Sequence, residues 1–162
     1  MPVDRLTLRV AVNLILERDG LVLLLRRHQT GWEDGNYAPI AGHLEAGETV
    51  REAVAREARE EAGVRVDPAD LRLVHLMHRH EGAGYVDVFF VAERWEGEPI
   101  IGEPDRCDDL LWCSQDQLPQ NMVPYAAAGL RHYGAAESYS EFGWDETAPR
   151  TGRSDDTWAS KR

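Results

Sequence analysis

The chain has 162 residues and a formal net charge of −11, with no basic run. Such an acidic protein is not expected to bind nucleic acid, because that binding relies on lysine and arginine to neutralise phosphates. No apolar stretch reaches membrane length, the start is not a signal peptide, and Cys107 and Cys113 are expected to be free thiols, so we expect a cytoplasmic protein with no membrane partner.

Strand and helix signals alternate along the first 133 residues. Asp19-Gly20 is typical of a hairpin turn, and Pro39 limits its strand to a short or edge position. The predicted strands span 6–16, 21–27, 37–43, 71–80, 85–95 and 110–113, and the predicted helices span 50–62, 115–118 and 123–133. This order indicates an α/β fold, with a mixed central sheet covered on both faces as an α/β/α sandwich.

The pattern fades in the last part of the chain. Residues 134–162 are polar, mixed in charge and without periodicity, which predicts a mobile C-terminal tail after a main domain at 1–133. Phe142 and Trp144 are exceptions, and they would pin the tail to the body or to a second subunit. Both a monomer and a homodimer are therefore open.

The most informative stretch spans residues 42–64. Thr49 and Glu52 form a capping box, which predicts that a helix begins at the residue after the threonine. Gly63 supplies the left-handed residue that ends this helix.

Three glutamates of this helix occupy an unusual position. At about 100° per residue, Glu57 and Glu61 lie on the apolar face, and Glu60 lies at its border. Carboxylates that point inward one turn apart repel one another and lose hydration. A positive group must lie between them, and a hard divalent cation is the natural candidate. The alternative is an ordinary charged helix surface, since arginines lie in the same segment.

The same stretch resembles the Nudix box, G-x5-E-x7-R-E-U-x-E-E-x-G-U, where U is a bulky aliphatic residue. The positions that match at the required spacing are Gly42, Glu48, Arg56, Glu57, Glu60, Glu61, Gly63 and Val64. Ala58 stands at the first aliphatic position and is smaller than usual. The resemblance is to MutT-like members, covers roughly residues 5–133, and implies the Nudix fold.

The resemblance also implies a metal centre. By similarity, Glu57, Glu60 and Glu61 would hold Mg²⁺, with Mn²⁺ as a substitute, and the metal would bridge substrate phosphates. One of these glutamates would also orient water. Arg56 and Glu48 would pair and fix the loop against the helix.

Two further metal ligands follow from the same resemblance. The main-chain carbonyl of Ala41 precedes the box glycine, where the family offers a carbonyl to the metal. Glu103 stands where MutT-like enzymes place a loop carboxylate that reaches the metal. Alternatives are the neighbouring aspartates Asp105, Asp108 and Asp109, or an acidic loop that is simply solvated.

Substrate-binding residues are implied less directly. Arg27 lies fifteen residues before Gly42, where MutT-like enzymes place an arginine on the substrate phosphates; the alternative is an arginine at a strand end. Trp32 and Tyr37 would stack on a base. Asn121 lies one position from an asparagine that MutT uses, and Gly42 completes the predicted set.

These features predict a Mg²⁺-dependent pyrophosphohydrolase. It would cleave a nucleoside triphosphate, or a nucleoside diphosphate linked to another group, to a monophosphate and pyrophosphate. The alternatives are an ADP-ribose or nucleotide-sugar pyrophosphatase and a module that binds a nucleotide without turning it over. The expected partner is a small nucleotide. Oxidised guanine is disfavoured, because Tyr125 and Ala126 stand where related animal enzymes carry two aspartates.

Overall fold

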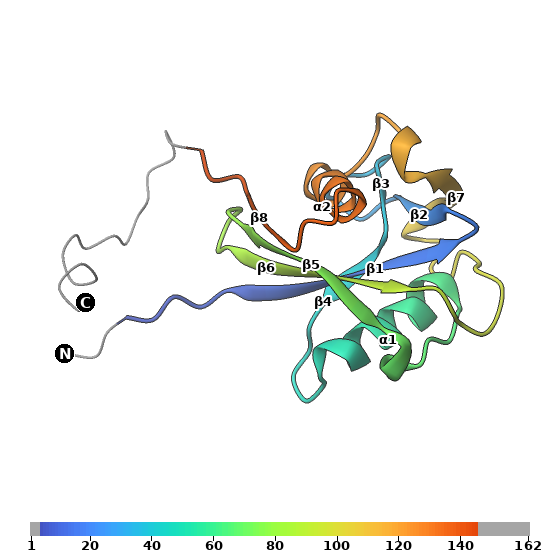
Figure 1. Cartoon of the computed structure of the whole chain (residues 1–162), viewed down its shortest axis with the longest axis horizontal. Coiled ribbons are helices and arrows are strands. Elements are labelled where there is room, and N and C mark those ends of the chain that lie inside the picture. The colour runs from blue at the N-terminus through green and yellow to red at the C-terminus, as the bar shows by residue number, and fades with distance from the viewer. Residues whose placement is uncertain (1–3, 146–162) are drawn as a thin grey trace.

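The computed structural model describes residues 4–145 (Figure 1). The strands are β1 (Arg9–Arg18), β2 (Leu21–Arg27), β3 (Tyr37–Ala38), β4 (Ile40–His43), β5 (Arg72–Arg79), β6 (Tyr85–Ala92), β7 (Cys107–Ser114) and β8 (Tyr139–Phe142). The helices are α1 (Val50–Ala62) and α2 (Pro124–Gly134), with 3₁₀ turns at η1 (Pro68–Asp70) and η2 (Gln115–Gln117).

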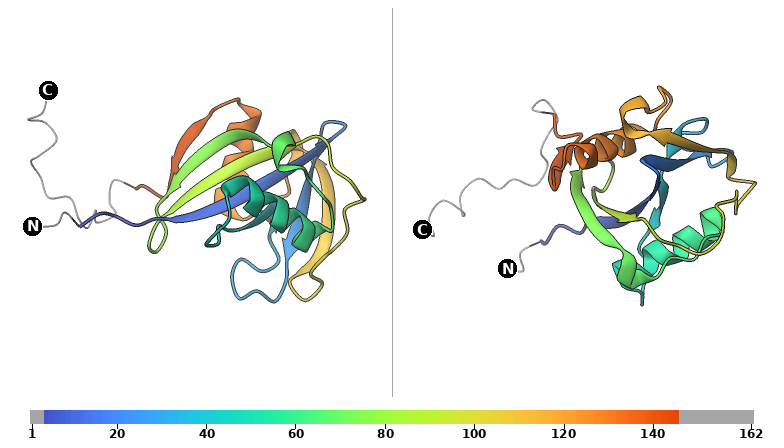
Figure 2. Two further views of the ribbon diagram at one scale, coloured as in Figure 1. Left: turned by 90° about the horizontal axis from the view of Figure 1, so that it is seen from below. Right: turned by 45° about the vertical axis from the view of Figure 1, so that its right-hand side comes forward.

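Strand β1 is the centre of the mixed sheet. It pairs with β6 in parallel and with β4 in antiparallel fashion, while its last two residues pair with β2. The strands run in the order β3-β2-β1-β6-β5-β8, with β4 added beside β1 and β7 beside β2. Helices α1 and α2 lie on opposite sides of the sheet (Figures 1 and 2). The predicted α/β/α sandwich with a mixed sheet is therefore confirmed.

Alternate residues of β1 enter two separate cores. Val12, Leu14 and Leu16 pack in the core beneath α1, whereas Ile15 packs in the core beneath α2. Asn13 is fully buried between these apolar neighbours, which requires that its amide find partners inside the protein. One of those partners is Tyr125, which lines the pocket of the candidate active site.

Helix α1 begins and ends as predicted. The Thr49 hydroxyl accepts the Glu52 N–H, and the Glu52 side chain accepts the Thr49 N–H, which completes the capping box. Gly63 has φ 65°, the left-handed conformation that terminates the helix. Helix α2 begins one residue later than predicted, with Pro124 in the first turn, where a missing N–H costs nothing.

Two predicted strands have different bounds in the structure. Strand β1 begins at Arg9 rather than at residue 6, because its partner β6 begins level with it at Tyr85. The predicted strand at 37–43 is divided at Pro39 into β3, which pairs with β2, and β4, which pairs with β1. Proline has no N–H to donate to a ladder, so the chain changes partner there.

Strand β7 is longer than predicted. It begins at Cys107 instead of residue 110 and pairs with the whole of β2. The acidic residues at its start are compatible with a strand because Asp108 accepts a hydrogen bond from Arg26 on the neighbouring strand at 2.7 Å.

The chain continues into the sheet beyond residue 133. Residues 139–142 form β8, which pairs in parallel with β5, so the prediction of a mobile tail is wrong for this segment. Ser140 explains the failure: its buried hydroxyl bonds His75, and a polar residue that faces inward breaks the pattern expected of a strand. Trp144 packs on His78 and His80. Residues 146–162 of the predicted tail lie outside the described residues.

Within residues 4–145, no helix is long and apolar enough to cross a membrane.

Candidate active site

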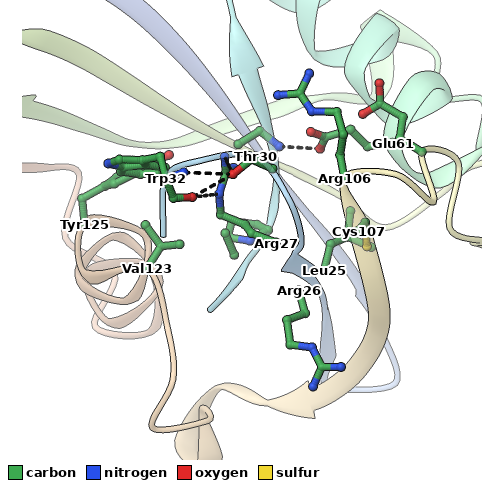
Figure 3. Close-up of a pocket in the computed structure, with 14 residues that line it drawn as sticks. Leu25, Arg26, Arg27, Thr30, Trp32, Glu61, Arg106, Cys107, Val123 and Tyr125 are labelled. Atoms are coloured by element: carbon green, nitrogen blue, oxygen red, sulfur yellow. Dashed lines mark hydrogen bonds between the residues drawn. The ribbon is translucent and has the colours of Figure 1, made fainter. Parts of the chain in front are cut away.

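A pocket lies between the last turn of α1 and the first turn of α2, which reach it from opposite sides of the sheet (Figure 3). Trp32, Val123 and Tyr125 meet at one end of it, and Glu61 and Arg106 lie at the other, with Arg27 between the two ends. The residues at the two ends come from distant parts of the chain, so only folding assembles this arrangement.

Glu61 of α1 is a carboxylate at the acidic end of the pocket. Its Oε2 accepts the main-chain N–H of Ala41 on β4 at 2.9 Å. Burial raises the pKa of Glu61 to about 8, although the hydrogen bond from Ala41 opposes this, and the carboxylates of Glu57 and Glu103 raise the pKa further. The ionised form of Glu61 is thus disfavoured unless a positive group lies beside it.

Arg56 holds the other box carboxylates. Its guanidinium donates to both oxygens of Glu48, at 2.8 and 3.0 Å, which is the pairing implied by the resemblance. The same group bonds Glu57 at 2.7 Å and Glu60 at 3.3 Å. It also donates to the carbonyl of His43 at 3.0 Å, so one arginine ties the loop to the helix.

The order of burial along the helix agrees with the helical wheel. Glu57 is buried, Glu61 is partly buried, and Glu60 is exposed. Burial is the main cause that raises the pKa of Glu57, and Arg56 opposes this rise. The positive group that we expected between the glutamates is therefore, for Glu57 and Glu60, an arginine of the same helix.

Gly42 gives Glu57 its space. A Cβ at residue 42 would lie 1.9 Å from Glu57 Oε1 and 2.1 Å from its carboxyl carbon. Since β4 runs directly against α1 at this point, only glycine allows the carboxylate to stay where it is. The structure thus gives Gly42 a clear role in supporting the site; a contact with substrate remains a prediction.

The loop after β6 is fastened to the end of α1. The main-chain N–H groups of Ile100 and Gly102 donate to the carbonyls of Ala62 and Glu61 at 3.0 and 2.9 Å. These carbonyls have no partner within the helix, so the loop satisfies them. Glu103 follows directly and lines the same pocket as Glu61.

The three aspartates considered as alternatives to Glu103 do not line the pocket. Asp108 bonds Arg26, and Asp109 accepts the hydroxyl of Tyr37. The structure therefore places Glu103, and not Asp105, Asp108 or Asp109, beside Glu61.

The carboxylates fit a hard cation in chemistry but do not converge on one point. Within residues 4–145, no three His, Cys, Asp or Glu side chains are grouped closely enough to hold a metal ion. Glu61 and Glu103 nevertheless share a pocket and offer the oxygen donors that Mg²⁺ prefers. The N–H and C=O of one residue in an antiparallel strand point to the same side, so the Ala41 carbonyl faces the edge where Glu61 lies. The residues present fit such an ion.

Arg27 is the last residue of β2, and its side chain is held in the pocket. Its Nε donates to the Trp32 carbonyl at 2.8 Å, and its Nη2 donates to the Thr30 hydroxyl at 2.9 Å. Its guanidinium also lies 4.9 Å from the centroid of a Trp32 ring. Asp34 accepts the N–H groups of Thr30 and Gly31, which holds the loop that carries Trp32.

Two of the predicted substrate-binding residues lie elsewhere. Tyr37 is buried with its hydroxyl bonded to Asp109, and its ring lies 5.8 Å from the guanidinium of Arg26. Asn121 donates from its side chain to the carbonyl of Gly35 at 2.9 Å. Neither residue lines the pocket, because their side chains are used to join the loop after β2 to its surroundings.

The pocket is also lined by Arg106 and Tyr125, which the sequence did not predict as site residues. Tyr125 entered only as a departure from animal enzymes, although an aromatic residue beside Pro124 at a predicted helix start was a usable signal. Arg106 carries no local signal, because it lies in a loop that only the contacts with α1 place.

The chain is similar to known hydrolases over most of its described length. A family model described as the NUDIX domain matches residues 7–133. The 8-oxo-dGTP diphosphatase of Escherichia coli K12 is 28% identical over 123 residues, which cover 74% of this chain and 94% of that protein. The NAD-capped RNA hydrolase NudC of Pseudomonas aeruginosa is 36% identical over 119 residues, 74% of this chain but only 40% of that protein.

Solved structures of related proteins have the same fold. The crystal structure of a MutT NUDIX hydrolase from Burkholderia pseudomallei has a TM-score of 0.70 at 30% identity, with 77% of this chain and 97% of that chain covered. Fold and site together define a hydrolase that acts on phosphorus-containing acid anhydrides. The chain belongs to the Nudix family.

Proposed function

We propose that this Nudix protein is a Mg²⁺-dependent pyrophosphohydrolase that converts a nucleoside triphosphate to a monophosphate and pyrophosphate. One observation carries the proposal: a single pocket has an aromatic end, an acidic end, and Arg27 between them (Figure 3). A nucleotide has the matching order of a planar base, a sugar and a chain of phosphates.

The side chains of the site have different proposed roles. Arg27 binds phosphate oxygens, because its guanidinium is fixed by Trp32 and Thr30 and has no carboxylate partner among the contacts of the described residues. Arg56 and Glu48 keep the box loop on the helix. Glu57, Glu60, Glu61 and Glu103, with the Ala41 carbonyl, would hold the cation. One carboxylate of this set orients the attacking water.

Family members use divalent cations, and the choice of Mg²⁺ over Mn²⁺ is part of this proposal. When bound, the cation supplies neutralisation of the charge that develops on the phosphates. Water attacks directly in this proposal, without a covalent intermediate on the enzyme. The Cys107 thiol lines the pocket, but burial raises its pKa and its Sγ donates to the carbonyl of Asp109, so it is poorly suited to act as a nucleophile.

A substrate panel tests the proposal. The purified chain is incubated with the four common nucleoside triphosphates, ADP-ribose and a nucleotide sugar, each with Mg²⁺, with Mn²⁺, and with a chelator. Release of pyrophosphate from a triphosphate, lost with the chelator, is the expected result. Release of phosphate alone, or activity on ADP-ribose without activity on any triphosphate, contradicts the proposed substrate in favour of the alternative. Binding without turnover of any compound points to the sensing module.

NAD-capped RNA is added to this panel as a further substrate. A relative that is 36% identical is named as an NAD-capped RNA hydrolase. We propose that the present chain acts on a free nucleotide, given its net charge of −11. Faster hydrolysis of NAD-capped RNA than of every free nucleotide would contradict this.

Light scattering of the same sample distinguishes a monomer from a homodimer.

A further inference from the structure

Tyr125 forms one wall of the aromatic end of the pocket. It lies in the first turn of α2 and is buried, with 7% of its surface exposed. Its ring centroid is 6.4 Å from that of Trp32, and the two ring planes are inclined by 32°. Trp32 is 40% exposed, so one wall is fixed inside the protein and the other stands at the surface.

A buried polar network holds Tyr125 from behind. Arg79 of β5 places its guanidinium carbon 4.1 Å from the ring centroid, a distance at which the cation lies over a ring face. Arg79 is bonded to both oxygens of Asp87 at 2.7 and 3.0 Å, and Asp87 is fully buried. The Tyr125 hydroxyl donates to the Asn13 side-chain oxygen at 3.2 Å, and the Asn13 amide donates to the Val88 carbonyl at 3.4 Å.

This network is poorly explained by stability alone. A buried ion pair loses hydration on folding and often contributes no more than apolar residues of the same volume. What it does provide is a single position for the tyrosine ring. Arg79 occupies one face of that ring, and Tyr125 also lines the pocket, so a ligand in the pocket meets the part of the ring that Arg79 leaves uncovered.

The aromatic end offers stacking but little hydrogen bonding. Among the described residues that line the pocket, none is an aspartate, an asparagine or a glutamine. The Tyr125 hydroxyl is used by Asn13, and the Thr30 hydroxyl bonds Asp34 and Arg27. Apart from the indole N–H of Trp32, the polar side-chain groups described at this end are therefore already engaged, and little is left to read the edge of one particular base.

We propose that Tyr125 is a substrate-binding residue, the fixed wall on which the planar base of a nucleotide stacks, with Trp32 as the opposite wall. The base is recognised by its flat face, so purines and pyrimidines are both accepted. The two ring centroids lie 6.4 Å apart and the planes are inclined by 32°, so the exposed Trp32 has to turn and move outward to admit a base between the rings. This inference rests on the proposed function, because it takes the ligand to be a nucleotide.

Calorimetric titration tests the inference without turnover. The ligands are the α,β-methylene analogues of ATP, GTP, CTP and UTP, and methylenediphosphonate as a probe with no base, all with Mg²⁺. Stacking of one base on one aromatic ring predicts that Tyr125→Met weakens nucleotide binding about 5- to 150-fold. Trp32→Ala should do the same, whereas Tyr125→Phe should keep binding within threefold. Binding of methylenediphosphonate should not change.

The control is Tyr139→Met, at an exposed tyrosine on β8. Three results overturn the inference. The first is that Trp32→Ala and Tyr125→Met both bind the nucleotide analogues with the Kd of the parent. The second is that binding of methylenediphosphonate weakens as much as binding of the nucleotide analogues, and the third is that the parent prefers one base more than a hundredfold. If Tyr125→Met does not fold, binding by Trp32→Ala, at an exposed position, and the base preference of the parent still test the inference. Failure of the proposed function is a separate outcome, since the parent would bind these analogues normally but release no pyrophosphate in the substrate panel.

Discussion

At the scale of single residues, Gly42 leaves no room for a side chain beside Glu57. We predict that Gly42→Ala costs about 1–3 kcal/mol of unfolding free energy, because the added methyl group overlaps the Glu57 carboxylate. Urea denaturation measures this. The matched control is Gly134→Ala at the end of α2, where a Cβ meets only the flexible tip of Gln115 at 3.0 Å. That variant should stay within about 1 kcal/mol of the parent. Equal effects of the two substitutions would contradict the argument.

Glu61 carries the second prediction at this scale. Glu61→Gln should lower kcat at least about 100-fold and leave the fold intact, since the amide oxygen can still accept the Ala41 N–H but its charge is lost. Steady-state kinetics and circular dichroism are the measurements. Glu93→Gln, at an exposed position outside the site, is the control and should behave as the parent. Turnover of Glu61→Gln within threefold of the parent would remove Glu61 from the proposed set of cation ligands.

At the scale of elements, His75 connects β5, β8 and the segment after α2. Its Nδ1 donates to the Glu137 carbonyl and its Nε2 accepts from Ser140, both at 2.7 Å. Its ring stacks on His132, which is bonded to the Glu137 carboxylate. Burial is the main cause that lowers the pKa of His75, and the carbonyl of Glu137 opposes this. The neutral imidazole is therefore the form that the fold selects.

The sign of the pH effect follows from this shift. The unfolded chain takes up the His75 proton near pH 6.5, and the folded chain does so only at lower pH. Stability is therefore full above about pH 6.5 and falls as the pH decreases through that value. We predict that the unfolding free energy of His75→Gln depends less steeply on pH between 7.5 and 5.5 than that of the parent. His80→Gln, at an exposed position, should keep the parent's slope; an unchanged slope in His75→Gln would refute the assignment.

At the scale of the whole molecule, the end of the fold can be located by truncation. A chain that stops at residue 145 retains β8 and Trp144, and it should keep the parent's activity and its stability within about 0.5 kcal/mol. A chain that stops at residue 134 loses β8 and uncovers His75, and it should lose more than about 2 kcal/mol. Urea unfolding compares the three chains. A large loss already at 145 would mean that residues 146–162 contribute to the fold, against their polar and aperiodic sequence.

Helix α1 was predictable because its signals are local. The capping box, the terminal glycine and the positions of Glu57, Glu60 and Glu61 all lie within four turns of one helix, where sequence spacing alone sets geometry. The box arginine and Glu48 lie eight positions apart, so their pairing was also within reach of the sequence. The general architecture followed from the order of strands and helices.

The tertiary structure decided what depends on contacts between distant segments. Tyr125 becomes a pocket wall only because Asn13 and Arg79, from two strands of the sheet, hold its ring. Strand β8 exists because β5 supplies its hydrogen-bonding partners, which compensates for its polar sequence. Tyr37 and Asn121 have suitable side chains for a substrate, but neighbouring residues already use them. Spacing along the chain was enough to predict the family, helix α1, Trp32 and the glutamates at the acidic end of the pocket. The position of Tyr125 at the aromatic end required the fold, since non-local hydrogen bonds and packing leave no periodic trace in the chain.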